Sequence, residues 1–311
     1  MVQNLIVGAA LRSDGADPAG WRRRARAAED AGLSLLVITE PPGAPTSATA
    51  ATSLDPIELA SFLGATTSAI ALVPASAATH AEPYHLSNRL SSLDWGTHGR
   101  AGWLTGVDVS SERARAYGAS TPHDPEAEAA AVIDIVRRLW DSWEDGALIA
   151  DTAAGRFLDN TKLHRTDLDS DPFRIHGPAL MPRPIQGQIP VLVRGEALLA
   201  GSDVRLVHPE QAAPVSDAAA ARTFVELSVT HGSAGRDLAD VLRSWVDSSD
   251  GVLLISEAAD QDAFLEVVSG AARILREDGI LRPPRPGLTL REQLGLTRPE
   301  SRYASAAAVQ R

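Results

Sequence analysis

Short apolar runs alternate with longer amphipathic stretches along most of the chain. The runs, which predict buried strands, cover residues 5–10, 35–39, 70–74, 101–107, 191–193, 204–207, 224–229 and 252–255. Strands separated by helical stretches are typical of βα units, because two parallel strands need a crossover connection. Eight such units predict the α/β class and a closed (β/α)₈ TIM barrel.

Helix starts are marked by an aspartate followed directly by a proline, at Asp17, Asp55 and Asp124. An aspartate side chain accepts hydrogen bonds from the first helical N–H groups, and proline fits the first helical position. Glu58 lies three residues after Asp55, which predicts a reciprocal capping box. We therefore expect helices over residues 21–31 and 127–140, and one that begins after Asp55.

Two segments interrupt the alternation. Residues 145–190 are rich in glycine and proline and predict a loop-rich excursion or lid between the fourth and fifth strands. We expect the excursion to lie over the top or side of the barrel. Residues 282–311 predict a C-terminal tail, with a mobile end from residue 301. The predicted organisation is one barrel domain over residues 1–281, which includes the excursion, followed by the tail.

Composition excludes several classes of partner. The formal net charge of −11 argues against nucleic acid, whose phosphates require a basic surface. No run of 18 apolar residues occurs, and the first apolar run lacks a basic leader, so we expect neither a membrane span nor a signal peptide. The chain has no cysteine, which fits a reducing compartment. We expect a cytoplasmic protein.

Candidate functional residues follow from the barrel, because its site lies at the carboxyl ends of the strands. His80 follows the third strand and could transfer protons near neutral pH, although a loop histidine without a role is the alternative. Glu40 follows the second strand and could bind a ligand or simply lie in solvent. Arg100 precedes the fourth strand at the opposite end, where we expect a structural role.

Four groups of residues carry a family resemblance. They are EPYHLSNRLSSLDWGTHGRAGW at 82–103, LWDSWEDGAL at 139–148, FRIHGP at 173–178 with Gln186-Gly187 and PVLV at 190–193, and TLREQLGL at 289–296 with Arg298-Pro299. In this order they resemble the nitrilotriacetate and dibenzothiophene-sulfone monooxygenase branch of the luciferase-like flavin monooxygenases. The matches span most of the chain.

The resemblance implies a flavin-dependent enzyme that folds as a TIM barrel. Members use reduced FMN delivered by a separate NAD(P)H-dependent flavin reductase, activate O₂ and oxygenate a small organic substrate. The resemblance also implies a homodimer. The cofactor supplies the reactive chemistry, and the protein binds it, excludes water and orients the substrate.

The cofactor-binding positions of the family correspond here to Glu40, Ser76, Ala77, Thr79, Leu104, Thr105, Arg194, Gly195 and Glu196. Several depart from the family pattern. Leu104 stands where an asparagine amide would reach the flavin ring, and leucine has no hydrogen-bonding group. Glu196 falls in the phosphate loop, where a carboxylate repels the phosphate and Arg194 attracts it. We therefore expect weak FMN binding.

Three functions remain open from the sequence. The first is a flavin-dependent monooxygenase with an altered site, in which His80 is the candidate catalytic residue. The second is a non-catalytic luciferase-like barrel that has lost tight flavin binding and acts as the partner of a genuine monooxygenase subunit. The third is an oxidoreductase that uses the deazaflavin F420.

Overall fold

Eight parallel strands form a barrel, as the alternation of apolar runs predicts. The computed structural model describes residues 5–14, 17–41, 53–118, 120–170, 173–212, 221–230, 234–256 and 260–304. The strands are β1 (Ile6–Arg12), β2 (Leu35–Thr39), β3 (Ala71–Pro74), β4 (Trp103–Thr105), β9 (Val191–Arg194), β10 (Val204–Val207), β11 (Arg222–Val229) and β12 (Gly251–Ser256). They pair in the order β3-β2-β1-β12-β11-β10-β9-β4. Parallel bridges from Leu72 to Ala101 and from Ala75 to Leu104 join the two edge strands, so the barrel closes.

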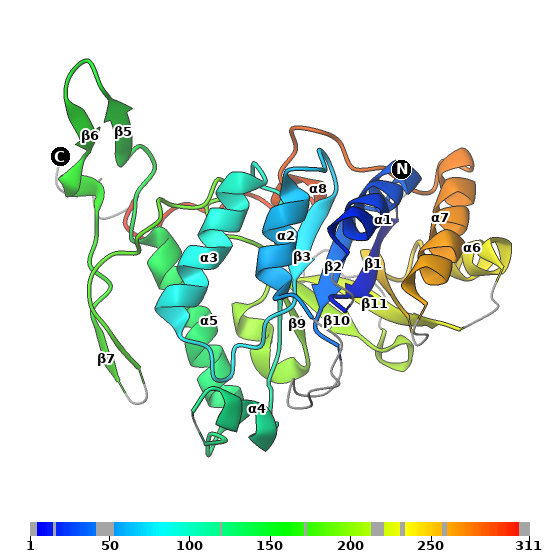
Figure 1. Cartoon of the computed structure of the whole chain (residues 1–311), viewed down its shortest axis with the longest axis horizontal. Coiled ribbons are helices and arrows are strands. Elements are labelled where there is room, and N and C mark those ends of the chain that lie inside the picture. The colour runs from blue at the N-terminus through cyan, green and yellow to red at the C-terminus, as the bar shows by residue number, and fades with distance from the viewer. Residues whose placement is uncertain are drawn as a thin grey trace.

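Helices cover the outside of the barrel (Figure 1). They are α1 (Pro18–Ala31), α2 (Pro56–Gly64), α3 (Pro83–Gly96), α4 (Ser111–Ala116), α5 (Pro125–Asp141), α6 (Gly235–Arg243) and α7 (Gln261–Glu277). Asp17, Asp55 and Asp124 cap α1, α2 and α5, as predicted. The capping box at Asp55 is wrong, because the Glu58 carboxylate accepts a hydrogen bond from the Arg89 guanidinium at 3.0 Å instead.

The barrel wall is thin after β9 and β10. Among the described residues, only the 3-10 helices η2 (Glu196–Gly201) and η3 (Pro209–Gln211) follow these strands. Helix η2 packs closely on α5, because a Cβ added to Gly201 would lie 2.9 Å from Ile133 Cγ2. Helix α5 thus supports η2 from outside the barrel.

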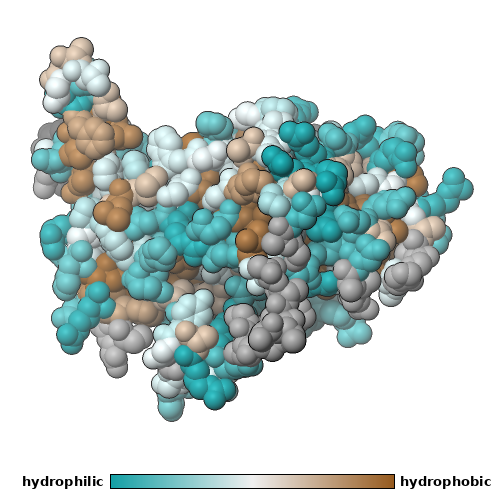
Figure 2. Space-filling model, in the orientation of Figure 1, coloured by the Kyte–Doolittle hydropathy of each residue, from teal (hydrophilic) through white to brown (hydrophobic). Residues whose placement is uncertain are grey.

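The excursion forms two small hairpins beside α3 and α5 (Figure 1). One pairs β5 (Leu148–Asp151) with β6 (Arg156–Leu158); the other follows η1 (Asn160–Lys162) and pairs β7 (Leu168–Ser170) with β8 (Phe173–Ile175). Figure 2 shows apolar residues along the protruding β5–β6 hairpin, where Phe157 is 65% exposed. The excursion thus lies at the side of the barrel, which is one of the two expected placements. None of its described residues lines the cavity at the carboxyl ends of β2, β3, β4 and β9, so the structure does not support a lid there.

The C-terminal tail closes the barrel at the end where the strands begin. Leu290 of α8 (Leu290–Gln293) and Leu294 are buried in one cluster with Leu192 and Leu253 from the barrel interior. The tail then runs to the excursion, where the Tyr303 ring stacks on His164 with centroids 4.0 Å apart. Of the end that we expect to be mobile, Ser301 is buried and Tyr303 makes this contact, while residues 305–311 lie outside the described part. The mobility of this end stays a prediction.

A buried polar network occupies this same end of the barrel. The Gln186 amide donates to the Asp94 carboxylate at 2.7 Å and accepts from the Arg291 backbone N–H at 2.8 Å. Arg291 also pairs with Asp203 at 2.9 Å. Arg100 donates to backbone carbonyl oxygens, including that of Ile70 at 2.7 Å, which agrees with its expected structural role. Most of these residues belong to the stretches that carry the family resemblance. Parts of those stretches therefore form the barrel end at which the strands begin.

No helix in the described ranges is long and apolar enough to cross a membrane.

Candidate functional site

A cavity of about 800 Å³ opens at the carboxyl ends of β2, β3, β4 and β9. It is lined by Thr39, Glu40, Ala75, Ser76, Ala77, Leu104, Thr105, Gly106, Val107, Asp108, Val109, Ser110, Arg113, Glu126, Arg194, Gly195, Glu196, Ala197 and Leu198. Parallel strands bring their carboxyl ends together, so loops that are distant in sequence meet here. We call this cavity the mouth cavity.

The structure brings together eight of the nine predicted cofactor-binding residues in the mouth cavity: Glu40, Ser76, Ala77, Leu104, Thr105, Arg194, Gly195 and Glu196. The ninth, Thr79, is buried behind it, where its hydroxyl accepts a hydrogen bond from the Asp108 backbone N–H at 3.0 Å. Thr79 therefore supports the loop that follows β4. Cofactor binding by these residues stays a prediction.

His80 faces a different cavity. It lines a space of about 1070 Å³ with His123, Glu128 and Phe173. Its backbone N–H donates to the Glu128 carboxylate at 2.9 Å, its φ is 64°, and its buried Nε2 has no hydrogen-bond partner among the described residues. The structure therefore separates His80 from the mouth cavity, and its catalytic role remains untested.

Glu40 is held by an arginine that the sequence did not suggest. Arg113 of α4 pairs with the Glu40 carboxylate, and its Nε lies 2.6 Å from the Asp108 carboxylate. Burial lowers the pKa of the Arg113 guanidinium, but the hydrogen bond to Glu40 and the charges of Glu40 and Asp108 raise it above its ordinary value. The arginine and its two carboxylates form a fixed ionic group on one wall of the cavity.

Arg194 is paired in the same way on the opposite wall. Its Nη2 lies 2.6 Å from one oxygen of Glu226, and its Nε lies 2.9 Å from the other. The Glu226 side chain is 15% exposed and projects from β11. Sequence reasoning missed Glu226, although it shares the inward face of its strand with Phe224 because side chains two residues apart point to the same face.

The mouth cavity is a poor fit for the phosphate of FMN. Both arginines that line it are bound to carboxylates, and its lining and the partner of Arg194 together supply Glu40, Asp108, Glu126, Glu196 and Glu226. A dianionic phosphate gains most from a free guanidinium or from backbone N–H groups, and it is repelled by carboxylates. Leu104 offers no hydrogen bond to a flavin ring. The charged side chains of the mouth cavity and Leu104 therefore do not fit FMN in the family's orientation.

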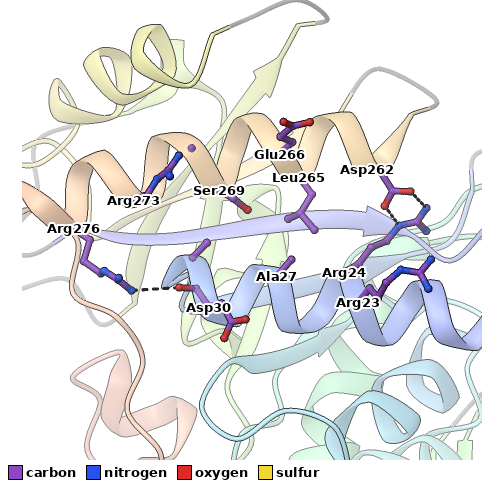
Figure 3. A pocket seen from close by; sticks show the side chains of 12 residues that line it. Arg23, Arg24, Ala27, Asp30, Asp262, Leu265, Glu266, Ser269, Arg273 and Arg276 are labelled. Carbon is purple, nitrogen blue, oxygen red and sulfur yellow. Dashed lines mark hydrogen bonds and ion pairs between the residues drawn. The ribbon is translucent and has the colours of Figure 1, made fainter.

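A second hollow of about 540 Å³ lies outside the barrel between α1 and α7 (Figure 3). Arg24 pairs with Asp262 across it at 2.6 Å, and Arg276 donates to the Asp30 carbonyl oxygen at 3.3 Å. It lies between helices and contains none of the predicted site residues, so we do not assign it to the site. The described residues contain no group of three or more His, Asp or Glu that could hold a metal ion.

Comparison with known proteins places most of the barrel in one family. Residues 5–244 match the model described as luciferase-like monooxygenase. The chain is 32% identical over 290 residues to a pristinamycin IIA synthase polypeptide from Streptomyces pristinaespiralis, which is named as one subunit of that synthase; the match covers 92% of each chain. It is 36% identical over 154 residues to nitrilotriacetate monooxygenase component A from Aminobacter aminovorans, covering 49% of this chain and 34% of that protein.

Solved structures show the same fold. A long-chain alkane monooxygenase superposes with a TM-score of 0.79 at 15% identity, over 95% of this chain and 96% of that one. EDTA monooxygenase from Chelativorans sp. BNC1 superposes with a TM-score of 0.78 at 16% identity, over 95% and 99%. The sequence resemblance and the predicted TIM barrel are thus both confirmed. This chain belongs to the luciferase-like monooxygenase family.

Proposed function

We propose that this chain is the subunit of a flavin-dependent monooxygenase that does not itself bind FMN. In this proposal a second luciferase-like subunit holds reduced FMN, which an NAD(P)H-dependent flavin reductase supplies, and the assembly uses O₂ to oxygenate a small organic substrate. The chain then contributes a folded barrel that supports the flavin-binding subunit.

The observation that carries this proposal is the pairing of both arginines in the mouth cavity. Arg194 is engaged by Glu226 and Arg113 by Glu40 and Asp108, so no free guanidinium faces the cavity from the described residues. The family resemblance puts Glu196 in the phosphate loop, where its carboxylate would repel the phosphate. An intact flavin site would need the opposite balance of charge.

The relatives support a multi-subunit assembly. The relative that matches almost the whole chain is named as a subunit of a synthase, whereas the nitrilotriacetate enzyme is matched over only 34% of its length. A partner of a different kind therefore has more support than the homodimer that the family resemblance implies, which stays a prediction.

The second candidate is a monooxygenase that itself binds the reduced FMN supplied by a partner reductase. Gly195 favours it, because its φ of 87° and the open space around its Cα would let a ligand approach the backbone closely. The fold is also shared by riboflavin lyase, whose structure contains a modified FMN, with a TM-score of 0.76 at 18% identity. An F420-dependent secondary alcohol dehydrogenase matches with a TM-score of 0.63 at 10% identity, but no described residue of the mouth cavity favours F420.

Titration of the purified chain with oxidised FMN, and anaerobically with reduced FMN, tests the proposal. We expect a Kd weaker than about 1 mM, which is less than about 4 kcal/mol of binding free energy. Micromolar binding of either form, measured by calorimetry or fluorescence quenching, would contradict the proposal and support a monooxygenase that binds FMN itself.

A further inference from the structure

Residues 109–118, which include α4, form one wall of the mouth cavity. Val109, Ser110 and Arg113 line the cavity, and Figure 1 shows α4 at the lower edge of the view, beyond the start of α5. The chain just before this segment is fixed to the barrel, because the Asp108 backbone N–H donates to the Thr79 hydroxyl at 3.0 Å. The fixed part of the loop after β4 therefore ends at Asp108.

Few apolar contacts hold this segment on the barrel. All six residues of α4 are described, and Ala114 is the only one of them that is buried. Val109 before the helix is 67% exposed, and Tyr117 after it is 63% exposed. A segment with so few buried apolar side chains opens locally at a low cost in free energy.

Both ends of the segment can act as hinges. At the far end Gly118 has a φ of 69°, and a Cβ added to it would meet no heavy atom within 4 Å. At the near end Val109 is exposed and joins the fixed Asp108 to the start of α4. The helix itself is held by local bonds, such as that from the Arg113 backbone N–H to the Ser110 hydroxyl at 3.2 Å, so α4 can move as one piece.

One ion pair ties α4 to a distant part of the mouth. Asp108 holds Nε of Arg113 at 2.6 Å, and this contact directs the rest of the guanidinium toward the Glu40 carboxylate in the loop after β2. Strands β2 and β4 lie on either side of β3, so the pair reaches across one strand end. The Arg113 side chain is 21% exposed and that of Glu40 is 38% exposed, so water and salt reach the pair.

We propose that residues 109–118 are a lid of the mouth cavity and that the ion pair of Arg113 with Glu40 is the latch that holds the lid closed. When the pair breaks, α4 swings about Val109 and Gly118 and opens the cavity, while Asp108 stays on the barrel. The lid controls access to the cavity for any ligand, so this inference goes beyond the proposed function and does not depend on whether the chain binds FMN.

Hydrogen–deuterium exchange of the full chain measures the opening of the lid. Glu40→Gln keeps the shape of the side chain and removes its charge, so the amides of residues 111–118 should exchange about threefold faster, with those of α1 and α7 unchanged. Glu58→Gln is the matched control, because Glu58 pairs with another helix arginine, Arg89, at 3.0 Å. It should leave the exchange of residues 111–118 as in the wild type.

A single thiol in the cavity measures access. The chain has no cysteine, and Ala77 lines the mouth cavity, so Ala77→Cys introduces one reporter. Its reaction with N-ethylmaleimide should be about threefold faster when Glu40→Gln is added, and unchanged when Glu58→Gln is added. In the wild type, about 1 M NaCl should also speed the exchange of residues 111–118, because salt screens the latch.

The latch is overturned if residues 111–118 exchange equally fast in the wild type and in the Glu40→Gln variant, or if salt leaves their exchange in the wild type unchanged. The salt experiment needs no variant to fold. An equal increase of exchange in α1 and α7 would also overturn it, because the change would then loosen the whole barrel. If the segment exchanges faster but the thiol at position 77 reacts at the same rate, α4 moves without opening the cavity and is not a lid.

Discussion

Arg194 on β9 lies flat against Glu226 on β11, with its Nη2 2.6 Å from one carboxylate oxygen and its Nε 2.9 Å from the other. The two strands are separated by β10, so the pair spans the inside of the barrel mouth. Glu226 neutralises the charge of this guanidinium and occupies its Nε and Nη2, so Arg194 attracts an anionic ligand less than an unpaired arginine would. The pair therefore removes the positive charge that Arg194 would otherwise present at the mouth.

Glu226→Gln should release Arg194 and strengthen the binding of FMN. The change removes one negative charge and leaves a neutral partner of the same shape, so we expect roughly a tenfold gain in FMN affinity. The fold should hold, because glutamine keeps the shape of the side chain and its amide oxygen can still accept a hydrogen bond from Arg194. Fluorescence titration checks the gain, with Glu277→Gln as control; a Kd equal to that of the wild type would show that the pair does not limit FMN binding.

Glu196→Ser should also strengthen FMN binding, because the resemblance puts this residue in the phosphate loop. Serine removes a repulsive charge and supplies a hydroxyl donor, so FMN affinity should rise. The same titration measures it. Unchanged or weaker FMN binding would mean that Glu196 does not face the phosphate.

Asp94 should make stability fall as pH rises. Burial raises the pKa of its carboxyl to about 6, although the hydrogen bonds from Gln186 act in the lowering direction. The folded pKa is above that of the unfolded chain, so this contribution to stability is complete below about pH 4 and is lost as pH rises through about 6.

Asp94→Asn should remove that dependence. Relative to the variant, the wild type should lose up to roughly 3 kcal/mol of unfolding free energy between pH 4 and pH 7.5, since one pKa unit corresponds to about 1.4 kcal/mol. Urea denaturation at pH 4, 5, 6 and 7.5 measures the difference. Parallel pH profiles for the two proteins would show that Asp94 is not the titrating group.

Two arginines that bind the same carboxylate should differ in their contribution to stability. Arg183 and Arg298 both pair with Asp145, but the side chain of Arg183 is 2% exposed and that of Arg298 is 45% exposed. Arg183 also pairs with the buried Asp141. Without Arg183 the buried Asp141 keeps only Arg302, 3.3 Å away, as an ion-pair partner among the described residues. Arg183→Met should therefore cost about 3 kcal/mol, the lower end for loss of one partner of a buried pair.

Arg298→Ala should cost no more than about 1 kcal/mol, because an exposed pair is screened by water and salt. Urea denaturation of the two variants side by side measures both values. Equal losses of unfolding free energy in the two variants would mean that burial does not determine how much each ion pair with Asp145 contributes.

The fold was predictable because its signal is local. Each of the eight strands is an apolar run bounded by turn residues, and the aspartates at 17, 55 and 124 cap helices by contacts within one turn. The family resemblance was also readable. Gln186 and Arg291 belong to the matching stretches and lie in the buried network far from the mouth. These matches therefore indicate the fold and not the chemistry of the site.

The site was only partly predictable. The position of a residue after its strand placed Glu40, Leu104 and Glu196 at the mouth, since strand ends meet there in any such barrel. The ion pairs of Glu40 and Arg194 were not predictable, because their partners Arg113 and Glu226 reach the mouth from other elements. His80 follows β3 as expected, but its loop turns it toward a neighbouring cavity, and no local pattern indicates that turn.

The most direct test of the central claim compares FMN with riboflavin, which has the same ring and lacks the phosphate. Calorimetric titration of the wild-type chain with both ligands isolates the contribution of the phosphate. Because the mouth arginines are paired and Glu196 is not, FMN should bind no more tightly than riboflavin. If FMN binds at micromolar concentration and riboflavin at least about a hundredfold more weakly, the phosphate is bound by the protein and the account is contradicted.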